Sequence, residues 1–192
     1  DSAYTLVWTI AGPCGTSRDT VNFSFQSLVL TNSCPGVASV TYAGEIYPTV
    51  QIGTQCWMAK NLNVGTMIQS TTAIDSQIDN GIIEKYCYNN IPSNCAIYGG
   101  LYQWAEAIQY DSVSPVSKGI CPTGWHIPHV NERNILAAYM DPSIDVQCNS
   151  CWSGNGGGLK STSNLWNSPN WCATNLSGFS ALPAGKNNIG YF

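Results

Sequence analysis

The two histidines of the chain, His126 and His129, are followed by Glu132 at the same spacing. Imidazole and carboxylate groups in this pattern could hold a transition metal or act as a general base. A continuous helix would bring both imidazoles to one face, but Pro128 lies between them and disfavours such a helix. We therefore expect no metal site, no catalytic residue and no cofactor here.

Other enzyme signatures are missing from the sequence. We find no phosphate-binding loop, no HExxH motif and no Ser-His-Asp arrangement. The sequence therefore predicts that the protein is not an enzyme.

The cysteines indicate an oxidising compartment. Nine cysteines in 192 residues are many for a reducing one, so we expect disulfides and an extracellular or cell-surface location. A zinc site is the alternative, because Cys148-Asn149-Ser150-Cys151 has the CxxC spacing. No second CxxC or histidine pair lies at zinc-finger distance, which favours disulfides. The odd count leaves at least one cysteine without an internal partner, and Cys14 and Cys121 are the candidates.

Three tryptophans, Trp152, Trp166 and Trp171, interrupt a region rich in Gly, Ser and Asn after residue 143. Exposed indole rings of this kind could bind carbohydrate without calcium. The alternative is that the rings fill the core beneath long loops. Calcium-dependent binding is disfavoured, because residues 166–170 (WNSPN) lack the acidic ligands that this cation prefers.

The charge of the chain excludes several classes of partner. Charged residues make up 9% of it, the net charge is −4, and the seven basic residues are scattered. An ordinary soluble domain contains roughly a quarter charged residues. This composition excludes nucleic acid and disfavours anionic lipid as partners. No apolar run approaches the ~20 residues of a membrane span. We also find no signal peptide, so the chain is expected to begin at a mature end or to be part of a longer protein.

Three hydroxyl residues, Ser2, Thr20 and Ser112, each follow an aspartate and precede alanine or valine. This pattern resembles the acceptor motif of a general bacterial O-glycosylation system. We predict covalent glycans on Thr20 and Ser112, and on Ser2 as the third site. The alternative is that each pair is an ordinary turn.

The N-terminal segment predicts a β-hairpin. Large apolar residues alternate with polar ones along two short stretches, which is typical of half-buried strands. Residues 11–15 contain Gly and Pro and predict the turn between them. A lone two-stranded hairpin is marginal in water, so something must cover its apolar face. That face comprises Tyr4, Leu6, Trp8, Ile10, Val21, Phe23 and Phe25.

Further elements are predicted after a linker at residues 32–36. Residues 40–52 indicate a second hairpin with its turn at Ala43-Gly44. Two apolar stripes at helical spacing predict helices. For the second we expect Asn131 as the N-cap and Asp141-Pro142 as the stop. The stripes are Leu101, Trp104, Ala105 and Ile108, and then Ile135, Leu136, Tyr139 and Met140.

Several blocks of sequence carry a family resemblance. They are YPTVQIG at 47–53, WMAKNL at 57–62, KYCYNN at 85–90 with NC at 94–95, YGGLYQW at 98–104, CPTGWHIP at 121–128 and GFSALPAG at 178–185. From about residue 40 to residue 192 the chain resembles the Fibrobacter succinogenes major paralogous domain, found in bacterial surface and secreted proteins. The GWHIP block before a helix also resembles C-type-lectin-like and formylglycine-generating-enzyme-like folds.

The resemblance implies an α+β fold with two helices flanking antiparallel sheets, and places His126 in a core hydrogen bond. Residues 4–26 resemble the last two strands of a bacterial Ig-like or PKD-like domain. We therefore predict a partial Ig-like segment at 1–33 and the major paralogous domain at 34–192, C-terminally incomplete. Family members continue beyond the equivalent of Phe192, to a cysteine that we expect to pair with Cys121. An oxidase like the formylglycine-generating enzymes is a distant alternative function.

Two disulfides are predicted. Cys87 and Cys95 enclose a short loop containing Pro92, between two of the resembling blocks. Cys34 and Cys56 bracket the hairpin of residues 40–52, whose ends come together. We expect Cys172 to pair with Cys148 or Cys151, without a choice between them.

Together these patterns predict an extracellular structural or adhesive protein of a bacterial surface. We expect a subunit of a glycosylated fibre, in which copies assemble head-to-tail by completing each other's sheets. Cys14 or Cys121 could then link subunits covalently. In the competing account the chain is part of a longer polypeptide that completes both domains itself. The alternative function is a carbohydrate-binding module of a surface adhesin.

Overall fold

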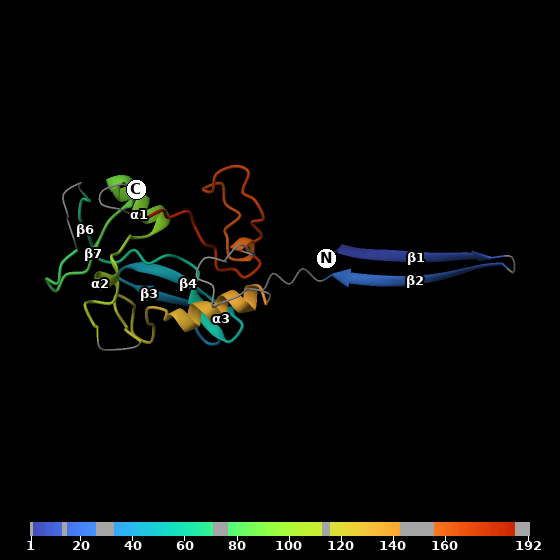
Figure 1. Cartoon of the computed structure of the whole chain (residues 1–192), viewed down its shortest axis with the longest axis horizontal. Helices are drawn as coiled ribbons and strands as arrows, with labels where there is room; N and C mark the ends of the chain where they lie inside the picture. The colour runs from blue at the N-terminus through green and yellow to red at the C-terminus, as the bar shows by residue number, and fades with distance from the viewer. Residues whose placement is uncertain are drawn as a thin grey trace. The chain divides into compact units, whose positions relative to one another are not determined.

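The computed structural model describes residues 2–12, 15–25, 33–70, 77–112, 116–142 and 156–186. The chain divides into two compact units, Asp1–Leu30 and Thr31–Phe192, which we call unit 1 and unit 2 (Figure 1). Within the described residues, no helix is long and apolar enough to span a membrane.

Unit 1 is a β-hairpin of two long strands. Strands β1 (Ser2–Gly12) and β2 (Gly15–Phe25) pair antiparallel over their whole length. In this register Tyr4 lies opposite Phe23 and Leu6 lies opposite Val21. Directly opposed residues of an antiparallel pair share one face, so all seven predicted apolar positions fall on the same face of the hairpin. The structure describes the backbone of these seven positions and not their side chains.

Unit 2 begins with a meander of three antiparallel strands. These are β3 (Ser39–Tyr42), β4 (Glu45–Ile52) and β5 (Gln55–Met58), in the order β3-β4-β5. Ala43 and Gly44 both have positive φ, 49° and 82°, as a tight two-residue hairpin turn requires. The predicted hairpin and its turn are therefore confirmed.

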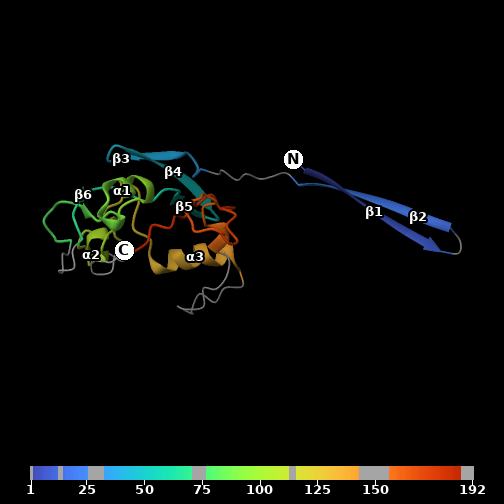
Figure 2. The ribbon, with the colours of Figure 1, turned by 90° about the horizontal axis from the view of Figure 1, so that it is seen from above.

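The core of unit 2 lies between this sheet and helix α3 (Val130–Met140). Val50 and Ile52 of β4 pack with Leu136 of α3, and all three are buried. The loops after residue 156 add Leu159 and Phe179 to the same cluster, and Figure 2 shows these loops between the sheet and α3.

The prediction for α3 was wrong about its N-cap residue and about how many of its apolar side chains are buried. The helix exists and ends at Asp141, but its N-cap is His129 and not Asn131, because the His129 Nδ1 atom accepts a hydrogen bond from the Asn131 N–H. Leu136 is buried as expected. Ile135 and Tyr139 are more than half exposed, so the apolar stripe is narrower than its spacing indicated.

The other predicted helix is shorter than expected. Helix α2 spans only Trp104–Ala107, because Gln109 and Tyr110 adopt positive φ values that end it. Leu101 lies outside it and forms a bridge with Tyr86, and Trp104 is 67% exposed. The helix that forms, with 4 residues, is therefore shorter than the apolar stripe of residues 101–108 indicated.

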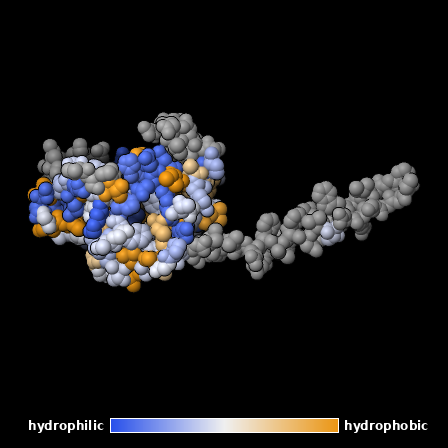
Figure 3. All heavy atoms as spheres, turned by 90° about the horizontal axis from the view of Figure 1, so that it is seen from below, coloured by the Kyte–Doolittle hydropathy of each residue, from blue (hydrophilic) through white to orange (hydrophobic). Residues whose placement is uncertain are grey.

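Several short elements were not predicted. Helix α1 (Pro92–Tyr98) was missed, although proline is favourable in the first turn of a helix. The strands β6 (Thr66–Met67) and β7 (Glu84–Lys85) pair in parallel. Short 3₁₀ helices span Tyr88–Asn90 and Gly156–Gly158. The described part of the chain is thus mixed α and β with long loops. Figure 3 shows that hydrophobic residues on one face of unit 2 form separate patches among hydrophilic ones.

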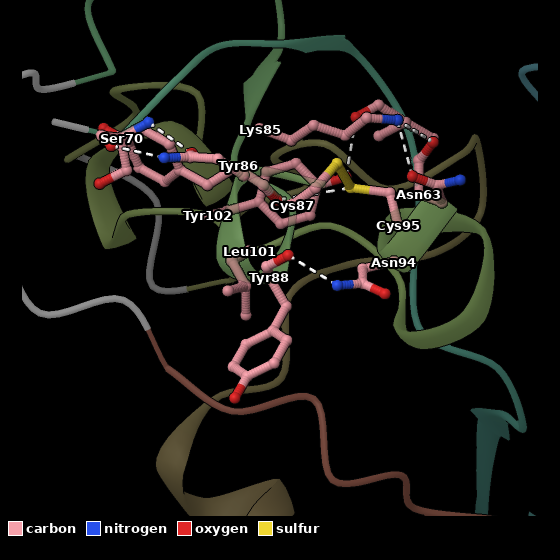
Figure 4. Close-up of a disulfide and its surroundings, with 12 residues drawn as sticks. Asn63, Ser70, Lys85, Tyr86, Cys87, Tyr88, Asn94, Cys95, Leu101 and Tyr102 are labelled. Carbon is pink, nitrogen blue, oxygen red and sulfur yellow. Dashed lines mark hydrogen bonds between the residues drawn. A yellow bond between two sulfur atoms is a disulfide. The ribbon is translucent and has the colours of Figure 1, made fainter. Parts of the chain in front are cut away.

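Both predicted cysteine pairs, Cys34–Cys56 and Cys87–Cys95, are disulfide-bonded in the structure. The second joins Cys87, which follows the Tyr86–Leu101 bridge, to Cys95 in the middle of α1 (Figure 4). A hydrogen bond supports the same segment, because Asn94 Nδ2 donates to the Tyr88 carbonyl at 2.8 Å. The sheet and the loops of unit 2 are each held by one disulfide.

Candidate functional site

The described part of unit 2 contains a pocket of about 510 Å³. This volume is within the range of small-molecule sites. Three aromatic residues from distant parts of the sequence, Trp57, Trp125 and Phe179, line it. We call it the aromatic pocket.

The β-sheet and a C-terminal loop together form one wall of the aromatic pocket. Trp57 lies on β5, and its ring meets that of Phe179 edge-to-face, with centroids 5.9 Å apart and planes at 69°. The Trp57 Nε1–H donates to Gln55 Oε1 at 3.3 Å, and Gln55 Nε2 donates to the Glu132 carbonyl at 3.0 Å. These bonds fix the indole ring between the sheet and α3.

The loop before α3 supplies another wall. The Trp125 N–H donates to the Pro122 carbonyl at 3.1 Å, which closes a turn containing Gly124 at φ 85°. The Ile127 N–H then donates to the Ser117 carbonyl at 2.9 Å. The loop therefore holds Trp125 at the pocket by its backbone.

The rim carries a histidine–carboxylate pair. The His126 Nε2 atom lies 2.8 Å and 3.0 Å from the two carboxylate oxygens of Glu132. The His129 backbone N–H also donates to Glu132 Oε2, at 2.8 Å. This N–H, followed by the contact with His126, lowers the pKa of Glu132 below its ordinary value.

The His-x-x-His-x-x-Glu pattern is thus a helix cap joined to a histidine–carboxylate hydrogen bond. Within the described ranges, no three His, Cys, Asp or Glu residues group as metal ligands would. The expected core position of His126 was wrong: its side chain is 40% exposed, and its partner Glu132 is one-third exposed.

The ammonium group of Lys60 at the pocket is also paired. Lys60 Nζ lies 2.6 Å from Glu45 Oε2 and 5.5 Å from the centroid of the Tyr47 ring. The Lys60 ammonium lowers the pKa of Glu45. The two charged side chains that line the pocket therefore both have partners, Glu45 for Lys60 and the hydrogen bonds with His126 and His129 for Glu132.

Two cysteines line the aromatic pocket. Cys56 is in the disulfide with Cys34, whereas Cys121 is buried and pairs with no described cysteine. Burial raises the pKa of the Cys121 thiol to about 11, so it stays protonated and unreactive at neutral pH. A buried thiol is also badly placed for the expected covalent link between subunits. Cys14 lies outside the described residues.

The tryptophans that the sequence singled out have different surroundings. Trp166 Nε1–H donates to the Ala181 carbonyl at 3.1 Å, and Lys160 Nζ lies 4.4 Å from its ring centroid. Its indole therefore supports a loop. Trp171 is 75% exposed, and Trp152 lies outside the described residues.

The predicted modification and pairing sites are only partly described. Thr20 and Ser112 are exposed, and Ser2 begins β1 with its side chain undescribed. Cys172 is exposed and forms no disulfide with a described cysteine. Its two proposed partners, Cys148 and Cys151, lie outside the described residues.

Sequence reasoning missed the aromatic pocket, although one signal was available. Its three rings each lie in a block that carried the family resemblance: Trp57 in WMAKNL, Trp125 in CPTGWHIP and Phe179 in GFSALPAG. Aromatic residues from separate blocks could have been predicted to converge, but their spacing alone could not show where.

A family model, described as the Fibrobacter succinogenes major domain, matches residues 50–191. Searches of curated proteins and of solved structures give no match. The match covers most of unit 2, including all three rings of the aromatic pocket, and the chain belongs to the Fibrobacter succinogenes major domain family.

Proposed function

We propose that this chain is an extracellular structural and adhesive protein of a bacterial surface, a subunit of a glycosylated fibre that assembles head-to-tail. In this proposal unit 1 is an Ig-like β segment and unit 2 is a C-type-lectin-like domain. The observation that carries it is the register of β1 and β2, which puts seven large apolar residues on one face of a two-stranded sheet.

Such a hairpin needs a second layer. Fully burying a large apolar side chain contributes about 1.5–3 kcal/mol, so seven of them on one face favour a covering partner strongly. Within the described residues, β1 and β2 pair only with each other. Each strand therefore also has an edge whose backbone groups can recruit another strand.

Strand addition from a second copy would satisfy both needs. Main-chain hydrogen bonds would extend the sheet, and alternate side chains would fill its apolar face. A contact between different surfaces of two copies does not close on itself unless a ring forms, so it produces a filament. Unit 2, held by its own disulfides and core, would be displayed along the fibre.

A matched pair of variants in the full chain tests the assembly. Leu6→Lys puts a charge on the apolar face, whereas Thr5→Lys puts the same charge on the opposite face of β1. We expect filaments by electron microscopy for the unsubstituted chain and for Thr5→Lys, and dispersed monomers for Leu6→Lys. A folded, unsubstituted chain that stays monomeric at micromolar concentration in light scattering would rule out the proposal.

Glycosylation has its own test. The exposure of Thr20 and Ser112 is compatible with modification. Intact-mass spectrometry of material from the native host should show hexose-sized additions, and peptide mapping should place them on the predicted residues. A mass equal to the bare 20.7 kDa polypeptide would end this part of the proposal.

The second candidate function is a carbohydrate-binding module, which the exposure of Trp171 favours. Binding on a glycan array should then survive EDTA and be lost in Trp171→Ala. Trp166→Ala should act through stability instead, because that ring is engaged by Ala181 and Lys160.

A further inference from the structure

We propose that the aromatic pocket binds an uncharged pyranose sugar without a metal ion. This site is separate from the hairpin of the proposed fibre and from Trp171. The pocket combines three features, namely aromatic walls, a polar rim and paired charges, and each of them restricts the ligand.

The walls favour a ring-shaped ligand with an apolar face. Trp57, Trp125 and Phe179 line a space of about 510 Å³, and the Trp57–Phe179 contact fixes two of the rings. A pyranose presents a patch of C–H groups on its face and hydroxyls at its edge. Its face can therefore stack on an indole while its edge remains available for hydrogen bonds.

The rim supplies hydrogen-bonding groups for such an edge. Asn61 Nδ2 is held by the Tyr98 carbonyl at 2.8 Å, and its carboxamide oxygen can accept from a hydroxyl. Glu132 is fixed by His126 and by the His129 backbone N–H, and its oxygens retain acceptor capacity. Since these groups are already positioned, binding costs them little conformational entropy.

The charges favour an uncharged sugar over an acidic or basic one. Lys60 is paired with Glu45, and His126 is paired with Glu132. A charged ligand would have to break one of these pairs or enter without a partner of its own. Among the described residues, no three His, Cys, Asp or Glu side chains group as metal ligands would, and the proposed binding uses stacking and hydrogen bonds.

The test uses the full chain and saturation-transfer NMR with uncharged sugars (glucose, galactose, mannose and N-acetylglucosamine), followed by titration calorimetry of any binder. Glucuronate and glucosamine serve as charged comparisons, and each measurement is made with and without EDTA. We expect at least one uncharged sugar to bind and the charged ones to bind more weakly. Transfer from none of the four, binding that EDTA abolishes, or equal binding of a charged sugar would overturn the proposal.

Variants locate the site. Trp125→Ala should weaken binding by at least about tenfold, and Asn61→Ala by about threefold to tenfold. Trp104→Ala is the matched control, because it removes an exposed indole that does not line the aromatic pocket and should leave the affinity unchanged.

If Trp125→Ala fails to fold, Asn61→Ala decides alone, since Asn61 is exposed and contributes little to the core. Affinity unchanged in a folded Trp125→Ala or in Asn61→Ala would contradict the proposal, as would loss of binding in Trp104→Ala. Electron microscopy of Trp125→Ala separates this result from the fibre proposal, because removal of a pocket residue should leave filament formation intact.

Discussion

Units 1 and 2 differ in the contacts that hold them together. Unit 1 is built from two strands that are neighbours in sequence, and its described hydrogen-bond pattern is a single ladder. Unit 2 joins distant segments: Gln55 bonds to Glu132, and Gln77 bonds to the Leu101 carbonyl. A local ladder forms readily but buries little, whereas a network of distant contacts buries a core. We therefore predict that unit 2 folds by itself and, under the proposal above, that unit 1 needs a covering partner.

The largest effect on unit 2 is expected at Tyr47. Its side chain is fully buried on β4, and its hydroxyl accepts the Asn63 N–H at 3.1 Å. Tyr47→Ala should lower the free energy of unfolding by about 3–5 kcal/mol, because it leaves a cavity and an unpaired donor. Ile46→Ala is the control on the exposed face of the same strand and should cost less than about 1 kcal/mol. Denaturant unfolding followed by tryptophan fluorescence measures both, and equal losses would show that β4 has no buried face.

The disulfides give the next largest effect. In the chain-entropy model, loss of Cys34–Cys56 costs about 3.4 kcal/mol and loss of Cys87–Cys95 about 2.6 kcal/mol, because the first closes the longer loop. Their sequence separations are 22 and 8 residues. Unfolding of the two double-alanine variants should show this order.

Non-reducing peptide mapping checks the pairing itself. Recovery of Cys87 as a free thiol, or joined to any cysteine but Cys95, would contradict the structure. Either result would also weaken the claim that unit 2 is self-sufficient.

A smaller effect is expected at Glu106, which is completely buried. One carboxylate oxygen accepts the Glu84 N–H at 2.9 Å, and the other accepts the Tyr110 hydroxyl at 2.9 Å. Glu106→Gln keeps the shape but turns an amide donor toward one of these donors, which should cost about 1–3 kcal/mol. Asp79→Asn is an exposed control of the same chemical change and should be neutral within error in the same unfolding assay.

The smallest effect is expected at Glu132, where the lowered pKa makes stability depend on pH. The carboxylate stabilises the folded state above the ordinary pKa of 4.5, and this contribution is lost as the pH falls through the lower folded value. Glu132→Gln should therefore cost about 0.3–1 kcal/mol at neutral pH. Thermal melts should show the difference between the two proteins shrinking in acid. A difference that grows in acid would contradict the helix-cap assignment.

The sequence was sufficient for elements whose signals are local. Alternation and turn residues predicted the hairpins at β1–β2 and β3–β4, because each strand pairs with the strand that follows it directly in the sequence. Helix α3 was predicted from its spacing. Its cap was assigned wrongly because an imidazole at His129, rather than an amide at Asn131, accepts the free N–H.

Features that depend on distant contacts could not be predicted. Helix α2 ends early because Gln109 and Tyr110 take positive φ, where both side chains bond to Glu106. Glu106 is itself held by the N–H of Glu84, 22 residues away in the sequence. The aromatic pocket brings together Trp57, Trp125 and Phe179, and no local pattern links them. Predicting it would have required the packing of β5 against the loops.

Hydrogen exchange on the hairpin tests the dependence of unit 1 on a partner most directly. Amides of β1 and β2 would be measured in the full chain, dispersed at low concentration and assembled at high concentration, with amides of β4 as the internal reference. The account predicts that the hairpin amides exchange rapidly when dispersed and become strongly protected on assembly, while β4 is protected throughout. Hairpin protection equal to that of β4 at every concentration would contradict it, because unit 1 would then be stable without a partner.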